Sequence, residues 1–246
     1  MIADPPSRSH LLALAGRTEV AERTLEFRLA KPPGFSFKAG QSMDLTLVAP
    51  PENDDEGSTR SFSICSAPSD EMLSFTTRVR DSAFKRVLAT LPIGSEIQAE
   101  GPHGDFTLHR KLERPAVLLA GGIGITPFRS MIREVLHRGN GRKIVLFYSN
   151  RRPEDAPFLD EFKSTAEQHP AFRFVPTMSR PQSSKVPWKG RTGQIELSLL
   201  REQLQDIENP MYYIAGPPGM VAALRDVLAG GGIQDDDIRT EEFSGY

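Results

Sequence analysis

The run RSFSICS at residues 60–66 brings together three kinds of side chain that could bind a flat, negatively charged ligand. An arginine pairs with phosphate groups, an aromatic ring lies against a planar ring, and a hydroxyl hydrogen-bonds a ring nitrogen. In an extended strand, alternation puts Arg60 and Phe62 on one face and Ser61 and Ser63 on the other. An ordinary β-strand explains the same alternation, so this run needs support from the rest of the chain.

Two glycine-rich turns follow apolar runs in the second half of the chain. GGIGITP at residues 121–127 follows AVLLAG, and AGPPGM at residues 215–220 follows MYYIAG. Glycines in such turns let the backbone approach a ligand closely, and the N-terminus of the next helix favours a phosphate group. Pro127 stands at the third glycine position of the G-x-G-x-x-G fingerprint, so that match is incomplete. Tight packing also explains either turn alone, but two turns at one sheet edge favour a crevice for an extended ligand.

Composition excludes several classes of protein. The chain has 246 residues, and its 30 basic and 32 acidic side chains leave a net charge of −2, so no general positive field attracts nucleic acid or an anionic membrane. Cys65 is the only cysteine, which excludes an intramolecular disulfide and any four-cysteine zinc site or iron–sulfur cluster within the chain. No apolar run approaches the roughly 18 residues of a membrane span. We therefore expect a soluble, cytoplasmic protein without a metal site.

The elements that must position these residues fall into two domains. Up to residue 110, short β-like runs alternate with Pro and Gly breaks, which predicts a six-stranded antiparallel β-barrel with one short helix near residues 83–89. From residue 111 the chain alternates strand and helix, and AVLLAG and KIVLFYS are continuously apolar, as in a sheet covered on both faces. The predicted fold class is therefore β + α/β: a barrel domain over residues 1–110 and a five-stranded parallel α/β domain over residues 111–246.

The first helix of the second domain carries its own start and stop signals. Phe128, Met131 and Ile132 fall on one helical face of the segment PFRSMIREVLHRG. Thr126 is expected to cap this helix, Pro127 suits its first turn, and Gly139 ends it. The glycine-rich turn is therefore predicted to lead directly into a helix.

Four motifs, in this order and spacing, resemble those of the ferredoxin–NADP reductase superfamily of flavoenzymes. They are R-x-F-S-x-x-S at residues 60–66, GGIGITP, AGPPGM, and the Glu-x-aromatic of residues 241–243. The likeness runs from about residue 11 to residue 246, nearly the whole chain. It implies a flavin, FAD, in the barrel domain and NAD(P)H in the α/β domain.

The resemblance also implies a flavin site residue by residue. Arg60 would contact the flavin phosphates, Phe62 would lie along the flavin in place of the family's usual tyrosine, and Ser63 would lie near the reactive N5 nitrogen. A second phosphate contact is expected from the amides of the helix near residues 83–89, although a surface amphipathic helix is the alternative interpretation. The expected flavin-binding residues are Arg60, Ser61, Phe62, Ser63, Arg78, Ser82 and Lys85.

The NAD(P)H site is expected at the carboxyl ends of the parallel strands. Ala215 stands where many members of the family have a cysteine, so no thiol acts at that position. Ser179-Arg180 resembles a clamp for the 2′-phosphate of NADPH, and a solvated loop explains it equally well. The expected nucleotide-binding residues are Gly121, Gly122, Gly124, Thr126, Pro127, Asn150, Arg151, Ser179, Arg180, Gly216, Pro217, Gly219 and Met220.

The carboxyl end completes the expected site. In the family, an aromatic ring at this end shields the flavin face that nicotinamide must reach. Phe243 matches on spacing, and Tyr246 is the alternative. The resemblance thus implies four catalytic candidates: Ser63, Glu241, Phe243 and Tyr246.

The implied activity is that of an NAD(P)H-dependent flavoprotein oxidoreductase, which passes hydride to FAD and electrons to a separate acceptor such as ferredoxin, flavodoxin or an oxygenase component. Arg110, Lys111 and Arg114 are candidate contacts for that acceptor, or else a solvated hinge. Two alternatives stay open: a sensor that binds flavin or nucleotide without turnover, and a reductase that uses free flavin as its substrate.

Overall fold

Period-two alternation of buried and exposed side chains builds an antiparallel sheet from the first half of the chain. The structure, a computed structural model, describes residues 8–80 and 82–243. The sheet has the strand order β4-β3-β6-β1-β2-β5. Its strands are β1 (Arg8–Ala21), β2 (Thr24–Ala30), β3 (Ser42–Leu47), β4 (Thr59–Ser63), β5 (Met72–Arg78) and β6 (Glu96–His103).

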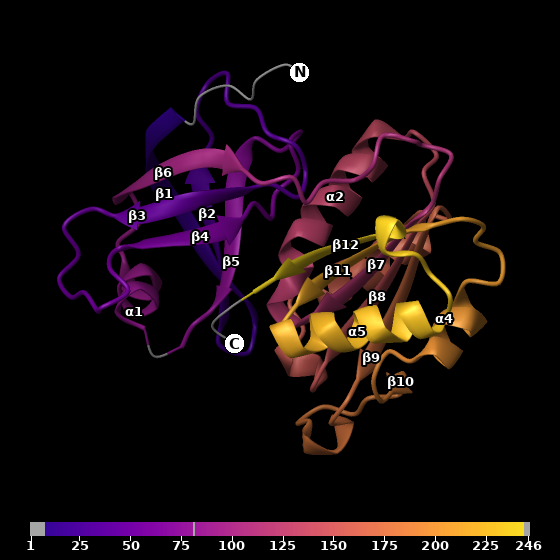
Figure 1. The fold of residues 1–246 in the computed structure, drawn as a ribbon. Helices are drawn as coiled ribbons and strands as arrows, with labels where there is room; N and C mark the ends of the chain where they lie inside the picture. The colour runs from indigo at the N-terminus through magenta and orange to yellow at the C-terminus, as the bar shows by residue number, and fades with distance from the viewer. Residues whose placement is uncertain (1–7, 81, 244–246) are drawn as a thin grey trace.

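The two outer strands of this sheet approach each other, as in a barrel. The Cys65 amide, just beyond β4, donates a 2.7 Å hydrogen bond to the carbonyl of Ser74 on β5. Helix α1 (Ala83–Thr90) follows β5 and packs Phe84, Val87 and Leu88 into the same apolar core. Six antiparallel strands and one helix were predicted here, and both predictions are confirmed (Figure 1).

Continuously apolar runs form the parallel sheet of the second half. Its order is β10-β9-β8-β7-β11-β12. The strands are β7 (Ala116–Gly121), β8 (Ile144–Asn150), β9 (Phe172–Met178), β10 (Arg191–Thr192), β11 (Met211–Gly216) and β12 (Ile238–Glu242). All five predicted strands are present, and β10, a two-residue strand at the sheet edge, is the sixth.

Four helices cover both faces of the parallel sheet. They are α2 (Ile125–Arg138), α3 (Leu159–Gln168), α4 (Leu197–Gln203) and α5 (Pro218–Gly230), with single 3-10 turns at Gly122–Gly124, Pro153–Asp155, Pro181–Ser183 and Asp235–Asp237. Helices α2 and α3 share one apolar core with the sheet, and α4 and α5 share the other. Figure 1 shows α2 on the side that faces the barrel and α5 on the opposite side.

The start of α2 differs from the prediction. The helix begins at Ile125 with Gly124 at its N-cap position, so Thr126 is already inside the first turn. Its hydroxyl donates to the carbonyl of Ile123 at 3.0 Å instead of accepting from a helix amide. The predicted cap was wrong because the glycine turn itself coils into the 3-10 turn that precedes the helix. Gly139 ends the helix in the left-handed conformation, as predicted.

Helix α2 also joins the two sheets through a buried ionic network. Arg129 pairs with Glu26 of β2 at 2.8 Å and with Glu161 of α3 at 2.9 Å. One turn away, Arg133 pairs with Asp70, and the Ser130 hydroxyl donates to the carbonyl of Ser66 at 2.6 Å. These contacts fix the barrel against the parallel sheet. The boundary at residues 110/111 falls in the connection between β6 and β7, and we keep it as a proposal.

None of the helices in the described ranges has the length and apolar character needed to span a bilayer.

Candidate functional site

A cavity of about 450 Å³ lies between the barrel and the parallel sheet. Its walls come from β4, the end of β5, the start of α1, the glycine turn before α2 and the residue after β12. Nine residues predicted from the sequence line it: Arg60, Ser61, Phe62, Ser63, Arg78, Ser82, Lys85, Thr126 and Phe243. Figure 1 shows the end of β12 reaching from the α/β domain toward the lower part of the barrel, which is also the part that carries α1.

Aromatic side chains fix the barrel wall of this cavity. The ring of Phe62 packs against Phe84 of α1 with a centroid distance of 5.8 Å and against Phe75 of β5 at 6.5 Å. The Arg60 guanidinium lies over the ring of Phe84, 5.4 Å from its centroid. Phe62 and Arg60 are therefore held in place from behind, while their other sides line the cavity.

An anion already sits where Arg60 and the N-terminus of α1 converge, and it is a carboxylate of the protein. Asp54 accepts a 3.1 Å hydrogen bond from Arg60 and a 2.9 Å hydrogen bond from the amide of Ala83, the first residue of α1. The Ala83 amide, and after it Arg60, lower the pKa of Asp54. Glu56 pairs with the same guanidinium at 2.7 Å. The Arg60 guanidinium and the Ala83 amide hold the Asp54 carboxylate between them. A phosphate group could be bound by the same two donors.

Three buried polar atoms around the cavity lack a hydrogen-bond partner among the described residues: Thr76 Oγ1, Arg78 Nε and Ser82 Oγ. Buried polar groups are normally paired, so orphaned donors and acceptors in a cavity wall indicate a polar ligand. The pKa of Lys85 is lowered, first by burial and then by the charge of Arg80. This donor set fits a phosphorylated, ring-bearing cofactor such as FAD.

The two glycine-rich turns pack against each other at the carboxyl ends of β7 and β11. A Cβ atom on Gly124 would lie 2.2 Å from the carbonyl oxygen of Ala215, and one on Gly121 would lie 2.1 Å from the sulfur of Met220. Both glycines are thus required by close packing of the turns. Gly219 opens α5 with free space around it, so packing does not explain that position.

The ends of β8 and β9 bring the other predicted nucleotide contacts together. The amide of Ser179 donates to the carbonyl of Asn150 at 2.9 Å, and the amide of Arg180 donates to the carbonyl of Arg151 at 2.8 Å. Asn150 is only 6% exposed, and both polar atoms of its amide lack a partner in the described part of the chain. The side chains of Arg151 and Arg180 are exposed.

Arg152, the next residue after Arg151, has a different role. Its guanidinium pairs with Asp155 at 2.7 Å and with Glu22 of the barrel at 2.9 Å. It therefore joins the two domains, and no local pattern indicated this contact because Glu22 lies far away in the chain.

Strand β12 carries Glu241 and Phe243 on one face, together with Arg239. Phe243 lines the cavity, and its amide donates to the carbonyl of Gly216 at 3.0 Å. Oε2 of Glu241 is buried without a partner among the described residues. Burial, and after it the charge of Asp105, raises the pKa of Glu241 to about 7. Tyr246, the alternative to Phe243, lies outside the described residues.

Cys65 lies apart from this chemistry. It is fully buried in the core between α2 and the barrel, with its sulfur 3.8 Å from Arg129, and burial raises the pKa of its thiol to about 11. A thiol with so high a pKa is not a nucleophile at neutral pH.

The sequence interpretation missed several members of the cavity. The cavity is also lined by five residues that were not predicted: Glu56, Thr76, Thr77, Arg80 and Ile123. The run TTRVR at residues 76–80 alternates hydroxyl and basic side chains, which was a usable signal. The loop that carries Glu56 and Asp54 offered none, because acidic loop residues are most simply solvated.

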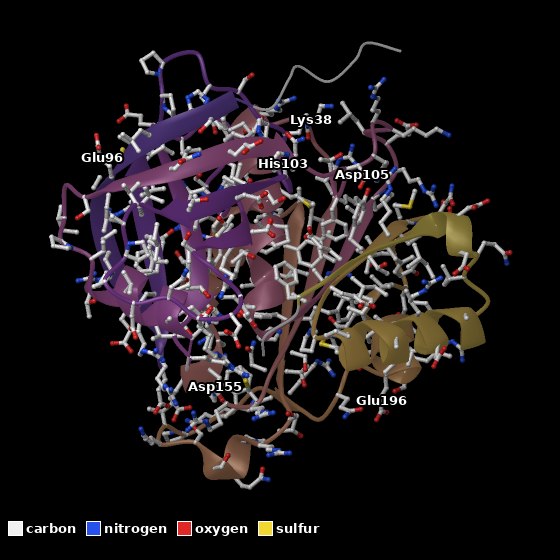
Figure 2. The ribbon with its side chains drawn as sticks, turned by 60° about the vertical axis from the view of Figure 1, so that its left-hand side comes forward. Lys38, Glu96, His103, Asp105, Asp155 and Glu196 are labelled. Atoms are coloured by element: carbon white, nitrogen blue, oxygen red, sulfur yellow. The ribbon has the colours of Figure 1, made fainter. Side chains whose placement is uncertain are left out.

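A second and larger cleft of about 980 Å³ lies elsewhere at the junction of the domains. It shares no lining residue with the 450 Å³ cavity, which we call the flavin-site cavity after the site that the sequence motifs predict. Figure 2 shows two of its residues, Lys38 and Asp105, at the opposite end of the junction from Asp155. Arg239 and Thr240 of β12 line this cleft, and Phe243, just beyond the strand, lines the smaller cavity.

The chain is similar in sequence to known proteins. Residues 118–226 match the family described as oxidoreductase NAD-binding domain. A ferredoxin–NADP reductase of Sorangium cellulosum is 31% identical over 237 residues, which cover 94% of this chain and 94% of that protein. The reductase component of propane 2-monooxygenase from Mycolicibacterium goodii is 28% identical over 96% of this chain and 67% of that protein.

Solved structures give the same picture of the fold. A crystal structure of a cytochrome P450 reductase from Amycolatopsis superposes on 97% of this chain and 70% of its own chain, with a TM-score of 0.81 and 26% identity. A ferredoxin NADP+ reductase from Neisseria gonorrhoeae, solved with bound FAD and NADP, covers 97% of this chain and 99% of its own, with a TM-score of 0.77 and 22% identity.

Proposed function

Because the chain belongs to the ferredoxin–NADP reductase family, we propose that it is an NAD(P)H-dependent flavoprotein oxidoreductase, which binds FAD and delivers electrons to a separate acceptor protein. The observation that carries this proposal is the 450 Å³ cavity between the domains. Residues from the barrel, from the glycine turn and from the end of β12 meet there, around a position at which Arg60 and the amide of Ala83 already hold an anion. A cytoplasmic location stays a prediction.

Each part of the cavity has a proposed task. Arg60 and the first amide of α1 bind a phosphate of the cofactor, and Phe62 lies along its ring system. Ser63, which is 5% exposed, donates or accepts a hydrogen bond at a ring nitrogen. Phe243 covers the ring, and Glu241 holds or releases a proton beside it. When bound, FAD supplies the redox chemistry that links a two-electron donor to its acceptor.

The nicotinamide nucleotide is assigned to the carboxyl ends of β7, β8, β9 and β11. Asn150 supports this assignment, because its amide is buried with both polar atoms unpaired. Arg151 and Arg180 add positive charge at the same sheet edge. The finer proposal is a preference for NADPH, since the exposed Arg180 after β9 can pair with a 2′-phosphate.

The acceptor is assigned to the 980 Å³ cleft. Five cationic side chains line it (Lys38, Arg110, Arg138, Arg142 and Arg239), against two acidic ones (Asp105 and Glu134). Within the described ranges, no carboxylate pairs with Lys38, Arg110 or Arg239. Arg114, in contrast, pairs with Asp237 at 2.6 Å, so its charge is already matched within the α/β domain. A positive cleft on a chain of net charge −2 favours an acidic protein surface as its partner.

One experiment tests the central proposal. Purified protein is titrated anaerobically with NADH and with NADPH, in separate cuvettes, while the flavin absorbance is recorded. Bleaching of a bound flavin is the expected result. A protein that stays colourless after addition of FAD would overturn the proposal. Bound flavin that neither nucleotide reduces would favour a sensor, and flavin lost on gel filtration would favour a free-flavin reductase.

A further inference from the structure

A buried hydrogen bond joins α2 to the segment of chain that leaves β4. The Ser130 hydroxyl donates to the carbonyl of Ser66 at 2.6 Å, from a position that is 0% exposed to one that is 3% exposed. A serine inside a helix commonly bonds the carbonyl one turn earlier in its own helix. Ser130 instead gives its proton to the other domain. Neither serine has a task in the proposed binding of FAD or of the nucleotide.

On the barrel side, the acceptor of this bond is held close to Ser63. The Ser66 hydroxyl accepts a 3.0 Å hydrogen bond from the amide of Ser74 on β5. The Cys65 amide donates to the carbonyl of the same Ser74 at 2.7 Å. Since β5 holds the segment at two successive residues, the carbonyl of Ser66 cannot shift far without displacing Ser63, three residues earlier in the chain.

On the other side, the donor is held close to the glycine-rich turn. Ser130 follows Thr126 by four residues, which is about 6 Å along a helix. The Thr126 hydroxyl donates to the carbonyl of Ile123 at 3.0 Å, and the Tyr148 hydroxyl donates to the carbonyl of Gly122 at 3.1 Å. Thr126 and Ile123 both line the flavin-site cavity. The turn and the first residues of α2 therefore move as one unit, to which Ser130 belongs.

We propose that Ser130 is a positioning residue for hydride transfer, because its bond to Ser66 sets the distance between the flavin wall at Ser63 and the glycine-rich turn. This inference rests on the proposed function. In the transfer, the hydride leaves the nicotinamide nucleotide with both electrons, so the nucleotide is oxidised and the flavin is reduced. The step requires near-contact between the two rings, and a misplacement of about 1 Å can cost about a hundredfold in rate. Ser130 would act on the rate through this distance alone.

The ion pairs on the same side of α2 constrain that distance less closely. Arg129 pairs with Glu26, and Arg133 pairs with Asp70. Both arginines are long and have several rotatable bonds, and the side chain of Arg133 is 41% exposed. The Ser130 hydroxyl has one torsion between its oxygen and the helix backbone, and its acceptor is a backbone atom. The two backbones are therefore coupled directly at this point.

The test replaces Ser130 with alanine, which removes the donor and suits a helix. Anaerobic stopped-flow absorbance of the FAD-loaded proteins with NADPH and with NADH gives the limiting rate of flavin reduction and the Kd of each nucleotide. Charge-transfer absorbance with the oxidised nucleotides reports ring contact without turnover. Deuterium exchange of the cofactor-free proteins reports the amides of residues 63–66 and 122–126. The controls are Arg133→Gln, on the same side of α2, and Ser198→Ala, an exposed serine on α4.

Ser130→Ala is expected to lower the limiting rate about tenfold, to leave both Kd values within about twofold and to weaken the charge-transfer absorbance. Without cofactor, exchange should become faster in both reported segments together. Both controls should keep the wild-type rate.

An unchanged rate in Ser130→Ala would overturn the inference. So would an equal fall in Arg133→Gln, since general loosening between the domains would then explain the effect. A loss confined to the affinity for FAD or for the nucleotides would also overturn it. If the wild type binds no flavin, or if neither nucleotide reduces it, the proposed function fails. If the wild type and Ser130→Ala are reduced equally fast, only this inference fails.

Discussion

Asp54 forms an ion pair of 3.1 Å with Arg60, which lines the flavin-site cavity, and the same carboxylate accepts from the first amide of α1. The acidic residue thus uses both donors that are assigned to a cofactor phosphate. A phosphate can take this position only if the loop that carries Asp54 releases it. Cofactor binding and the conformation of this loop are therefore expected to be coupled.

Replacing Asp54 with asparagine tests this competition. Asp54→Asn removes the charge that binds Arg60 and keeps the size of the side chain. The affinity for FAD is expected to rise about three- to tenfold, because the phosphate no longer displaces a carboxylate. Isothermal titration of the apoprotein measures it, with Asp55→Asn as the exposed neighbouring control. Weaker FAD binding would instead mean that Asp54 orients Arg60 in the loaded protein.

Ser63→Ala removes the hydroxyl from the β4 wall of the cavity and leaves the aromatic wall intact. We expect the rate of flavin reduction by NADPH to fall about ten- to a hundredfold, since alignment at the reacting nitrogen depends on that hydrogen bond. The bound flavin content should change little. Anaerobic stopped-flow absorbance measures the rate, with the exposed Ser69→Ala as a control. An unchanged rate would remove Ser63 from the proposed mechanism.

Glu241 gives the protein a pH-dependent stability with a definite sign. Its pKa is about 7 in the folded protein because of burial and Asp105, and it is about 4.3 in an unfolded chain. The folded state therefore binds this proton more tightly, and that stabilisation is lost as the pH rises through 7.

Between about pH 5 and pH 8, the wild type should lose at least about 1 kcal/mol relative to Glu241→Gln, or roughly 2–4 °C in melting temperature. Thermal unfolding at several pH values tests this prediction. Glu242→Gln, at the exposed neighbouring position, should follow the wild type. A constant difference between wild type and Glu241→Gln at all pH values would contradict the assignment of the raised pKa.

Arg180 distinguishes the two nicotinamide nucleotides. Arg180→Ala is expected to raise KM for NADPH about tenfold and to leave KM for NADH nearly unchanged, because only NADPH carries the 2′-phosphate. Steady-state dye reduction with each nucleotide measures both constants, and Arg201→Ala serves as the control. Equal effects on both nucleotides would assign Arg180 to the shared pyrophosphate or to a structural role.

Local pattern was sufficient for much of the fold. The helix over residues 83–90, the end of α2 at Gly139 and the alternation of strands and helices after residue 111 all follow from signals within about 15 residues of sequence. Such signals are local because hydrogen bonds in helices and the alternation in strands involve neighbouring residues. Strand β10 was missed because two exposed residues, Arg191 and Thr192, carry no periodicity.

The parts that could not be predicted depend on contacts between distant segments. Asp54 meets Ala83, Glu22 meets Arg152, and Cys65 meets Arg129. A single sequence does not show which charged loop residue will find a partner of opposite charge across a domain seam. The motifs pointed to residues that line one cavity, whereas the ion pairs around it came only from the three-dimensional structure.

Phe243, the residue after β12, is attached only lightly to the parallel sheet. Beyond the strand, the one backbone hydrogen bond that joins Phe243 to the sheet within the described residues runs from its amide to the carbonyl of Gly216. The ring is only partly buried at the edge of the apolar core, so its release is a local opening whose free energy is a fraction of that of global unfolding. The amide of Phe243 should therefore exchange with deuterium far faster than the amides of β7 or β11, and access to the cavity would be controlled by the motion of one residue.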